Sequence, residues 1–484
     1  MRKAPIRSVV LASAMLAALA SGMVNSGAAG GDPAKPTWWA KYQYLAAHPA
    51  ATGGAATQSV AVGANVDISN EPTPQSETAI AINPKNPAQI MGGSNEIVRD
   101  PMRAYYSADG GTTWTGSDLP LPPARVNNGF DFGSDPGVAW DNHDNVYYSY
   151  IVVFFGAGGG LNGTEMAVAH SSNGGLTWAP TYFAPQTGTA QFNDKPMITV
   201  DNRTSPSTVY VSWDNVSGAN GKASSTTGVL LSSSRDGGVT FSSPTFVSSQ
   251  ESGPKGDIAS QPFAGPDSTL YVAWHNYLTG DLDVASSSDR GASFGPTHLI
   301  HTTQAKFDVA IPAQNSRRAL IYPACGADNQ NRLTCSWTDV TASNGMDAFV
   351  ASSADGGMTW SAPVRVNDDA EGVATDQFNQ WLSIDPVDQS VNLSWNDTRN
   401  DPTHLSTDIF YARSTNGGQS FGANVQVTTA PTNETCCGAD PGNQYGDYEG
   451  IAAFGGDIHP IWTDRRAAVA ALDEEIFSAT ITVK

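Results

Sequence analysis

The chain has 484 residues, of which 46 are acidic and 25 are basic, giving a formal net charge of −21. This acidic balance argues against a nucleic-acid-binding surface, because such surfaces carry basic patches. The sequence is poor in Glu, Lys and Leu and rich in Ser, Thr, Gly and Val, which argues against helical repeats and favours an all-β fold. Length alone suggests about three domains.

The N-terminal segment has the organisation of a secretory signal peptide. Arg2, Lys3 and Arg7 precede an apolar run over residues 9–20, and small residues follow as far as residue 29. We therefore predict that residues 1–29 are a leader and that the mature protein is secreted or periplasmic. A membrane anchor is the alternative, but the apolar run is shorter than the roughly 20 residues that span a bilayer. No membrane span is expected once the leader is removed.

A short pattern, Ser-x-Asp/Asn-x-Gly-x-Thr/Ser-Trp/Phe, recurs six times at intervals of 53 to 66 residues. Its central residues are Asp109, Asn173, Asp236, Asp289, Asp355 and Asn416. A repeated ligand or metal site is one interpretation. We favour a structural role, because Asp or Asn, Gly, Ser and Thr are the residue types that a tight turn requires.

Strand-like runs that end in Trp recur between these turns. They cover residues 209–213, 270–274, 333–337, 391–395 and 458–462. Each run follows another strand, and a third and a fourth strand flank the turn pattern. Four strands about every 60 residues predict a β-propeller, and therefore a single domain rather than three.

The number of blades follows from the two ends of the chain. The pair formed by the first and second strands occurs seven times, but the turn pattern occurs six times. The last unit ends in a third strand over residues 474–483, and residues 59–68 resemble the outer strand at 421–427. We therefore predict a seven-bladed propeller over residues 58–484, with both chain ends closing the last blade and residues 30–57 as an N-terminal extension. Six blades is the alternative.

The four cysteines fit an exported protein. Cys325 and Cys335 flank a turn-rich segment, so antiparallel neighbours could place them opposite each other. Cys436 and Cys437 are adjacent and could form a vicinal disulfide. The other two pairings stay open. A metal site is the weaker interpretation, since no Cys-x-x-Cys occurs.

The turn pattern resembles the Asp-box, or BNR repeat, of the secreted bacterial sialidase-like propellers. The resemblance covers about residues 58–484 and implies the propeller fold. Members of this family include sialidases, other glycosidases, sorting receptors and assembly factors. The sialidases use three arginines, a tyrosine paired with a glutamate, and an aspartate acid/base. Their first arginine usually lies in a Phe/Tyr-Arg-Ile/Leu-Pro motif before the first strand, whereas residues 74–80 here contain no arginine.

The resemblance also implies that the mouth of the propeller lies opposite the Asp-box turns. An acidic residue recurs just before the inner strands, at Glu77, Asp135, Asp194, Asp257, Asp308, Asp376 and Asp447. Asp135 and Asp447 are candidates for acid–base chemistry, because crowded carboxylates raise one another's pKa. Ca²⁺ is a possible cofactor, with Asp194, Asp257 and Asp376 as candidate ligands. The alternative that we favour is that each Asp caps its own turn.

Arginines end several second strands. Arg99, Arg399 and Arg465, with Arg466 beside the last, are candidates for binding a substrate carboxylate, although local Asp–Arg pairs would explain them equally well. His275 and Phe378 are further candidate substrate-binding residues.

The loop before the seventh inner strand contains Tyr448 and Glu449, which could form a nucleophile and its base beside Asp447. A sugar-stacking or packing role for the tyrosine is the alternative.

Two functions remain open from the sequence. The first is a secreted glycoside hydrolase of exo-sialidase type that acts on acidic sugars at the propeller mouth. The second is a propeller without catalysis that binds a glycan or a protein, or serves as an envelope assembly factor. Either function implies an extracellular glycan or glycoprotein as partner and a monomeric chain.

Overall fold

The computed structural model describes residues 59–483, apart from residues 70, 72, 124–130, 156–160, 188–190, 218–224, 249–255, 342–344, 371–372 and 467–472. The predicted leader, residues 1–29, and the predicted extension, residues 30–57, lie outside the described residues.

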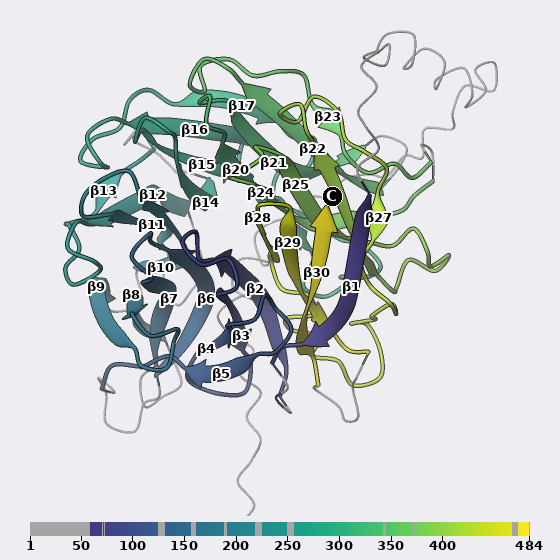
Figure 1. Cartoon of the computed structure of the whole chain (residues 1–484), viewed down its shortest axis with the longest axis horizontal. Coiled ribbons are helices and arrows are strands. Elements are labelled where there is room, and N and C mark those ends of the chain that lie inside the picture. Colours follow the sequence, from purple (N-terminus) through teal and green to yellow (C-terminus); the bar gives the residue numbers. More distant parts are fainter. Residues whose placement is uncertain are drawn as a thin grey trace, which may run out of the picture.

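The described strands form seven four-stranded antiparallel sheets arranged around one axis (Figure 1). Blade 1 contains β2 (Gln75–Ile82), β3 (Ile90–Glu96), β4 (Arg103–Ser107) and β5 (Thr115–Asp118); blade 2 contains β6 (Asp131–Trp140), β7 (Val146–Phe155), β8 (Leu161–Ser171) and β9 (Ala179–Thr187); blade 3 contains β10 (Gln191–Asp201), β11 (Thr208–Ser217), β12 (Ser225–Ser234) and β13 (Thr245–Phe246). Blade 4 contains β14 (Asp257–Ala264), β15 (Leu270–Asn276), β16 (Asp281–Ser287) and β17 (His298–Thr302); blade 5 contains β20 (Ala324–Ala327), β21 (Leu333–Thr341), β22 (Gly345–Ser353) and β23 (Val364–Arg365). Blade 6 contains β24 (Gln377–Ile384), β25 (Val391–Asp397), β26 (Asp408–Ser414) and β27 (Val425–Gln426), and blade 7 contains β28 (Gly450–Phe454), β29 (Asp457–Asp464), β30 (Glu475–Val483) and β1 (Val60–Asp67).

The two ends of the described chain close the ring in blade 7. β1 pairs antiparallel with β30, with Val60 opposite Val483, so the first strand becomes the outermost strand of the last blade (Figure 1). The prediction of seven blades closed by both chain ends is confirmed. The closure matters physically because a strand from one end covers the free edge left at the other end.

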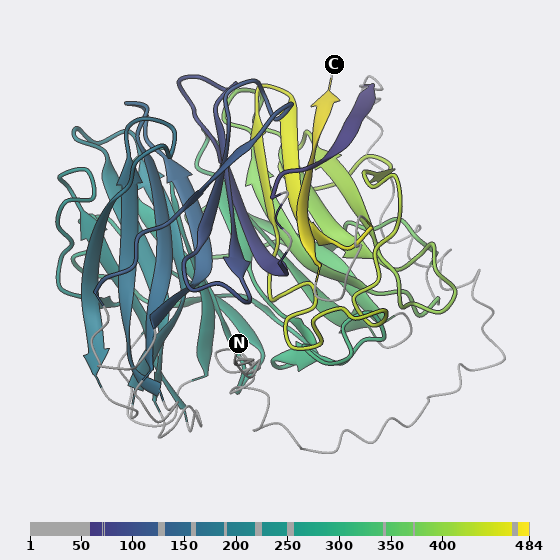
Figure 2. The same cartoon turned by 90° about the horizontal axis from the view of Figure 1, so that it is seen from below.

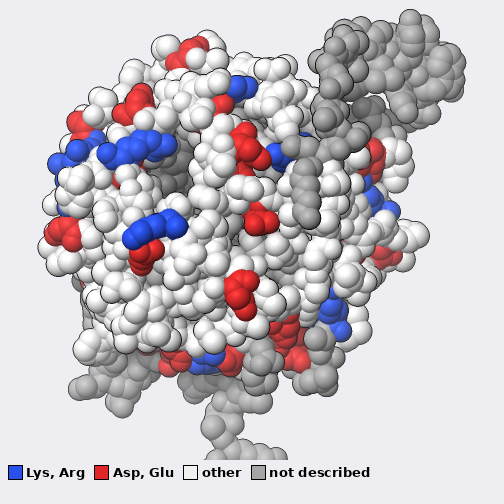
Figure 3. Space-filling view, viewed as in Figure 1, with Lys and Arg blue, Asp and Glu red and all other residues white. Residues whose placement is uncertain are grey.

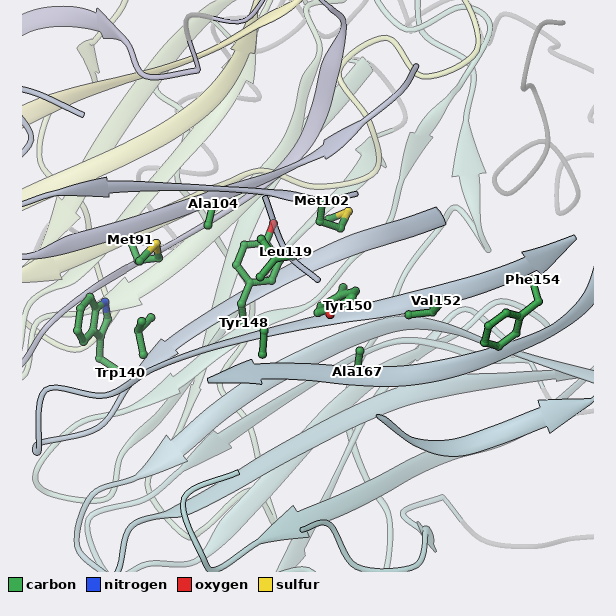
Figure 4. Close-up of a cluster of buried hydrophobic side chains, with 12 residues drawn as sticks. Met91, Met102, Ala104, Leu119, Trp140, Tyr148, Tyr150, Val152, Phe154 and Ala167 are labelled. Atoms are coloured by element: carbon green, nitrogen blue, oxygen red, sulfur yellow. The ribbon is translucent and has the colours of Figure 1, made fainter. Parts of the chain in front are cut away.

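Apolar side chains fill the space between neighbouring blades. In the cluster shown in Figure 4, Met91, Met102 and Ala104 of blade 1 lie in one buried group with Tyr148 and Tyr150 of blade 2. The tryptophans that end the second strands are also buried, at Trp213, Trp274, Trp337, Trp395 and Trp462. The Trp-ending runs recognised in the sequence therefore form part of the core.

The six repeated turns join the third strand of a blade to the fourth. In the first turn, Ser107 Oγ donates to Asp109 Oδ1 at 2.9 Å, and the Gly111 N–H donates to Ser107 Oγ at 2.9 Å. The Thr113 N–H donates to Asp109 Oδ1 at 2.9 Å. The same three bonds recur in the turns centred on Asn173, Asp236, Asp289, Asp355 and Asn416. Each central side chain is thus engaged by its own turn.

Blade 5 is preceded by an inserted two-stranded ribbon, β18 (Asp308–Val309) and β19 (Ala319–Leu320), which belongs to none of the seven blades. From the sequence, Asp308 is expected just before the inner strand of this blade. That expectation is wrong, because the inner strand is β20 and starts only after Pro323. Asp308 lies in the ribbon, where its carboxylate pairs with Arg318 Nε at 2.8 Å.

Both predicted cysteine pairs are present in the structure. Cys325 lies opposite Cys335 in adjacent strands and is bonded to it, and Cys436 is bonded to Cys437. Among the described residues, none forms a helix with the length and apolar character needed to cross a membrane.

Candidate functional site

A bulge interrupts the inner strand in most blades. At this point the strand contains a residue with positive φ: Glu77 (54°), Asp135 (61°), Lys195 (51°), Ala259 (61°) and Asn379 (50°). Bulges bend the strand and redirect its side chains. Because the bulges occupy equivalent places in their blades, they bring these residues to the same level of the propeller.

Charged side chains meet across the propeller axis at this level. Lys195 Nζ of blade 3 contacts Asp447 Oδ2, which precedes blade 7. Arg317 forms a bidentate pair with Asp447, from Nε to Oδ1 and from Nη2 to Oδ2, each at 2.7 Å. Arg317 Nη2 also lies 2.9 Å from Glu77 Oε1. Blades 3 and 7 are not neighbours in the ring, so these contacts cross its centre.

We call this group the axial cluster, and it consists of Glu77, Asp135, Asp194, Lys195, Arg317 and Asp447. Its side chains are almost fully buried, and that of Arg317 is 6% exposed. Asn95 connects two of its members, because Nδ2 donates to Glu77 Oε2 and Oδ1 accepts the Asp135 N–H at 2.7 Å.

The carboxyl groups of the axial cluster differ in how they hold a proton. Burial raises the pKa of Glu77 well above its usual range, and nearby Asp447 and Asp135 add to this shift. Burial likewise raises the pKa of Asp194 to about 7. Burial acts in the same direction on Asp447, but Arg317 and Lys195 outweigh it and lower the pKa to about 2. Burial also acts to raise the pKa of Asp135, but Lys195 and the hydrogen bonds with Glu77 and Asp194 together lower it. The cluster thus places carboxyl groups with a raised pKa beside carboxyl groups with a lowered pKa.

Four of the acidic residues singled out in the sequence, Glu77, Asp135, Asp194 and Asp447, are therefore brought together. Sequence reasoning missed the two cations. Lys195 had a detectable signal, because Lys195-Pro196 occupies the same place in its blade as Asp135-Pro136. Arg317 had none, since it belongs to the inserted ribbon and no repeat predicts where that ribbon folds.

Tyr448 and Glu449 do not form a nucleophile and base pair. The Tyr448 hydroxyl donates to the Pro136 carbonyl at 3.3 Å. Glu449 Oε2 instead accepts from Asn396 Nδ2 at 2.6 Å, and Oε1 accepts from the Thr463 N–H at 3.0 Å. The expected pairing is wrong because Glu449 is engaged between blades 6 and 7, away from the tyrosine hydroxyl.

The predicted arginine clamp is also wrong. Each arginine is paired with a carboxylate close to its own position: Arg99 with Asp118 at 2.7 Å, Arg399 with Asp397 at 2.7 Å, Arg465 with Glu474 at 3.3 Å and Arg466 with Asp464 at 2.5 Å. The physical reason is local, since three of the four arginines find an Asp within the same hairpin or sheet. The alternative of local Asp–Arg pairs describes these residues.

His275 and Phe378 are buried side chains that pack inside the fold. His275 Nε2 lies 3.2 Å from Thr303 Oγ1, and burial lowers the histidine pKa to about 3. Phe378 packs edge-on against Tyr445, with ring centroids 5.3 Å apart. Neither side chain is positioned to contact a substrate in this structure.

The three candidate calcium ligands belong to three different blades. Asp257 Oδ1 accepts from Asn276 Nδ2 at 2.9 Å, and Asp376 Oδ1 accepts from the Met346 N–H at 3.2 Å. Asp194 Oδ1 accepts from the Lys195 N–H at 3.1 Å. Within the described part of the chain, no group of three or more Asp, Glu, His or Cys residues is arranged to hold a metal ion. The donor set does not fit Ca²⁺.

On the face shown in Figure 3, acidic and basic side chains of the described residues are interspersed. The six charged side chains of the axial cluster, in contrast, are buried inside the ring.

No protein-family model matches the sequence, and no curated protein is significantly similar to it. Solved structures with a similar chain course include a Dyadobacter fermentans protein of unknown function, with 11% identity and a TM-score of 0.49 over 73% of this chain and 95% of that one. A Hadza microbial sialidase has 13% identity and a TM-score of 0.42 over 80% and 75% of the two chains. The Fusarium graminearum α-L-arabinofuranosidase, solved with an iminosugar inhibitor, has 10% identity and a TM-score of 0.46 over 87% and 98%. Similarity at this level concerns the propeller fold.

Proposed function

We propose that this protein is an exported propeller that acts on glycans and hydrolyses a glycosidic bond at the axial cluster. The proposal rests on the difference in pKa between the carboxyl groups of the axial cluster. Glycoside hydrolysis uses one carboxyl group that donates a proton and one carboxylate that stabilises or attacks the sugar carbon. Glu77 has the raised pKa that the first role needs, and Asp447 has the lowered pKa that the second role needs.

The spacing of these two groups supports the same chemistry. Glu77 Oε1 and Asp447 Oδ2 lie 2.9 and 2.7 Å from the same nitrogen, Arg317 Nη2, so the two oxygens are at most 5.6 Å apart. This limit is compatible with the separation of about 5 to 5.5 Å in retaining enzymes and is shorter than the roughly 6.5 to 9.5 Å of inverting enzymes. We therefore propose a retaining mechanism, in which Glu77 protonates the leaving oxygen and Asp447 faces the sugar carbon.

We propose an acidic sugar as the substrate, because both cations of the cluster, Lys195 and Arg317, lie beside the proposed catalytic pair. Arginine suits a sugar carboxylate through its planar pair of donors. Binding such a sugar would require Arg317 to exchange part of its pairing with Glu77 for the ligand.

Burial favours a second candidate function, a glycan-binding propeller without catalysis. The side chains of the proposed pair are 1% and 8% exposed. In that case the axial cluster joins the blades, and ligands bind elsewhere on the mouth.

The test is hydrolysis of a panel of aryl sialosides, uronides and arabinofuranosides by the mature protein and by Glu77→Gln. Turnover of one class is expected, with a loss of about 10² to 10⁴ in Glu77→Gln, the range that general acid catalysis contributes. Asp109→Asn is the matched control, because Asn occupies the same turn position at Asn173, and it should retain full activity. Saturable glycan binding without turnover would favour the second candidate, and absence of both would contradict a glycan-acting protein.

Export has its own test. Sequencing the N-terminus of protein recovered from outside the cytoplasm should show that cleavage has removed about the first 29 residues. Recovery of the intact leader on a cytoplasmic protein would contradict export.

A further inference from the structure

Two segments cover the axial cluster, and we call them together the cap. The first is residues 303–322, which includes the β18–β19 ribbon, and the second is residues 432–447, in the loop between β27 and β28. In Figure 2, the loop between β27 and β28 lies at the lower side of the molecule, opposite the C-terminal end of β30. Each segment contributes one member of the axial cluster, Arg317 from the first and Asp447 from the second.

The two halves of the cap are held to each other by hydrogen bonds. Gln444 Oε1 accepts the N–H groups of Ser316 and Arg317, at 3.1 and 3.0 Å. In return, Gln314 Nε2 donates to the Gly446 carbonyl at 3.0 Å. Loosening the second segment would therefore remove hydrogen-bond partners from the first.

An apolar contact holds the cap to the blades. Tyr445 is fully buried and packs with Ile311 and Ala319 of the first segment and with Phe378 of blade 6. This contact ties both segments of the cap to blade 6.

The second segment carries the vicinal disulfide Cys436–Cys437, and both residues are exposed. Their carbonyl oxygens accept hydrogen bonds from one side chain, Arg465, with Nη1 bonded to Cys436 O at 3.0 Å and Nη2 bonded to Cys437 O at 3.3 Å. Arg465 directly follows β29 of blade 7, so this guanidinium anchors the cap segment to the propeller. The other disulfide, Cys325–Cys335, is buried within blade 5.

We propose that Cys436–Cys437 is a thiol-operated latch, whose reduction releases the cap and opens the axial cluster. The proposal rests on the proposed function only in taking the axial cluster as the working site. The co-reactant is a dithiol. Its thiolate attacks one sulfur and breaks the Cys436–Cys437 bond, and the sulfur that leaves takes up a proton. The second thiol then resolves the mixed disulfide, so two electrons pass to the protein and the reductant becomes a cyclic disulfide.

The backbone explains why reduction would release the segment. Cys437 has a φ of 61°, a region that residues other than glycine rarely adopt. The disulfide ring ties this residue to its neighbour, and the two carbonyls face Arg465 together. Without the ring, Cys437 is free to leave this region, and its carbonyl then turns away from the guanidinium. Exposure makes this disulfide accessible to a reductant, whereas burial protects the other one.

The experiment measures opening without any substrate. Trypsin cleavage after Arg317 and deuterium exchange at the amides of Arg317 and Asp447 are followed by mass spectrometry, with and without dithiothreitol. Cleavage and exchange should accelerate at least tenfold on reduction. Cys436→Ser/Cys437→Ser should show the fast rates without reductant. If this double variant behaves like the oxidised protein, the latch is refuted.

Cys325→Ser/Cys335→Ser is the matched control and should keep the slow rates until reductant is added. Alkylation of the reduced wild-type protein gives a second control, because label should enter Cys436 and Cys437 but not Cys325 and Cys335. Label in all four cysteines together with fast cleavage would attribute the opening to general unfolding and would contradict the proposal.

The outcome can be separated from that of the proposed function. A cap that opens on reduction in a protein without glycosidase activity refutes the catalytic proposal alone. Glycosidase activity that is equal in the oxidised and reduced protein refutes the latch alone.

Discussion

Glu77 and Asp447 share one guanidinium, yet their environments assign them opposite protonation states. Asp447 neutralises both Lys195 and Arg317, so its negative charge is compensated twice. Glu77 is more deeply buried and has one cation at salt-bridge distance. The difference leads to a prediction about stability that does not depend on catalysis.

Asp447→Asn should destabilise the fold by about 3 to 5 kcal/mol, because it leaves two buried cations without their main partner. Glu77→Gln should lower the free energy of unfolding by less, since burial raises the pKa of Glu77 and so favours its neutral form, which glutamine resembles. Denaturant unfolding of both variants at neutral pH measures the difference. Equal losses in the two variants would contradict the assigned protonation states.

Gly446 lies where the cap meets Glu77, and its φ is 77°. A Cβ at this position would lie 2.3 Å from Glu77 Cγ, so Gly446→Ala should cost about 3 kcal/mol through strain and overpacking. Gly110→Ala is the matched control, because Gly110 has a similar φ of 70° but open space around it. The control should cost about 1 kcal/mol, from backbone strain alone. A similar loss of unfolding free energy in both variants would show that the contact with Glu77 is unimportant.

At the scale of the element, the six repeated turns act as local clamps on the third and fourth strands. In the fifth turn, Asp355 accepts bonds from the Ser353 hydroxyl and from the Thr359 N–H and hydroxyl. The hydrogen bonds from Thr359 lower the Asp355 pKa to about 2. The structure thus explains why Asn can replace Asp at two of the six positions, since the amide oxygen accepts the same backbone bond.

Asp355→Ala should lower the melting temperature, whereas Asp355→Asn should change it much less. The reason is that alanine leaves the Thr359 N–H and hydroxyl without this acceptor, while asparagine reproduces the arrangement seen around Asn173 and Asn416. Differential scanning calorimetry of the two variants provides the comparison. A larger loss for asparagine would mean that the charge, rather than the acceptor geometry, holds the turn.

At the scale of the whole molecule, several of the many acidic residues are carboxyl groups whose pKa is raised by burial. Burial raises the pKa to about 7 in Glu96, Asp194, Asp283 and Glu475. These groups lie in blades 1, 3, 4 and 7, so the effect is distributed around the ring.

These raised pKa values should make the stability of the fold decrease as the pH rises. A carboxyl group whose pKa is about 7 in the folded protein and about 4 in the unfolded chain stabilises the fold while it is protonated. This stabilisation is complete below about pH 4 and is lost as the pH rises through 7. The melting temperature should therefore fall between pH 5 and pH 8, and Asp194→Asn should make that fall shallower. A melting temperature that rises over this interval would contradict the raised values.

Asp447 should act in the opposite direction at acid pH. Its contribution is complete above about pH 4, the usual pKa of an aspartate in the unfolded chain, and is lost as the pH falls towards its folded pKa of about 2. Stability is therefore expected to be greatest in mildly acidic solution.

The propeller, its seven blades and the closure of the ring could all be predicted from the amino-acid sequence. Each of these features rests on local chemistry. Turn residues recur at fixed offsets, and strand-like runs recur between them. The last blade lacks an outer strand, and the N-terminal segment 59–68 resembles one. The four acidic residues of the axial cluster were also recognised, because they recur at one place in the repeat. The same reasoning could not choose between a substrate clamp and local Asp–Arg pairs for the arginines, since a local pattern does not say which way a long side chain points.

The pairing of charges at the axis becomes visible only in the folded chain. Lys195 contacts Asp447 across 252 residues, and Arg317 contacts Glu77 across 240. Contacts of this kind form because closing the ring brings distant inner strands to one axis, and because an insertion that follows no repeat places a guanidinium among them. The repeat describes how each blade folds, whereas the chemistry at the axis depends on how seven blades and the cap come together.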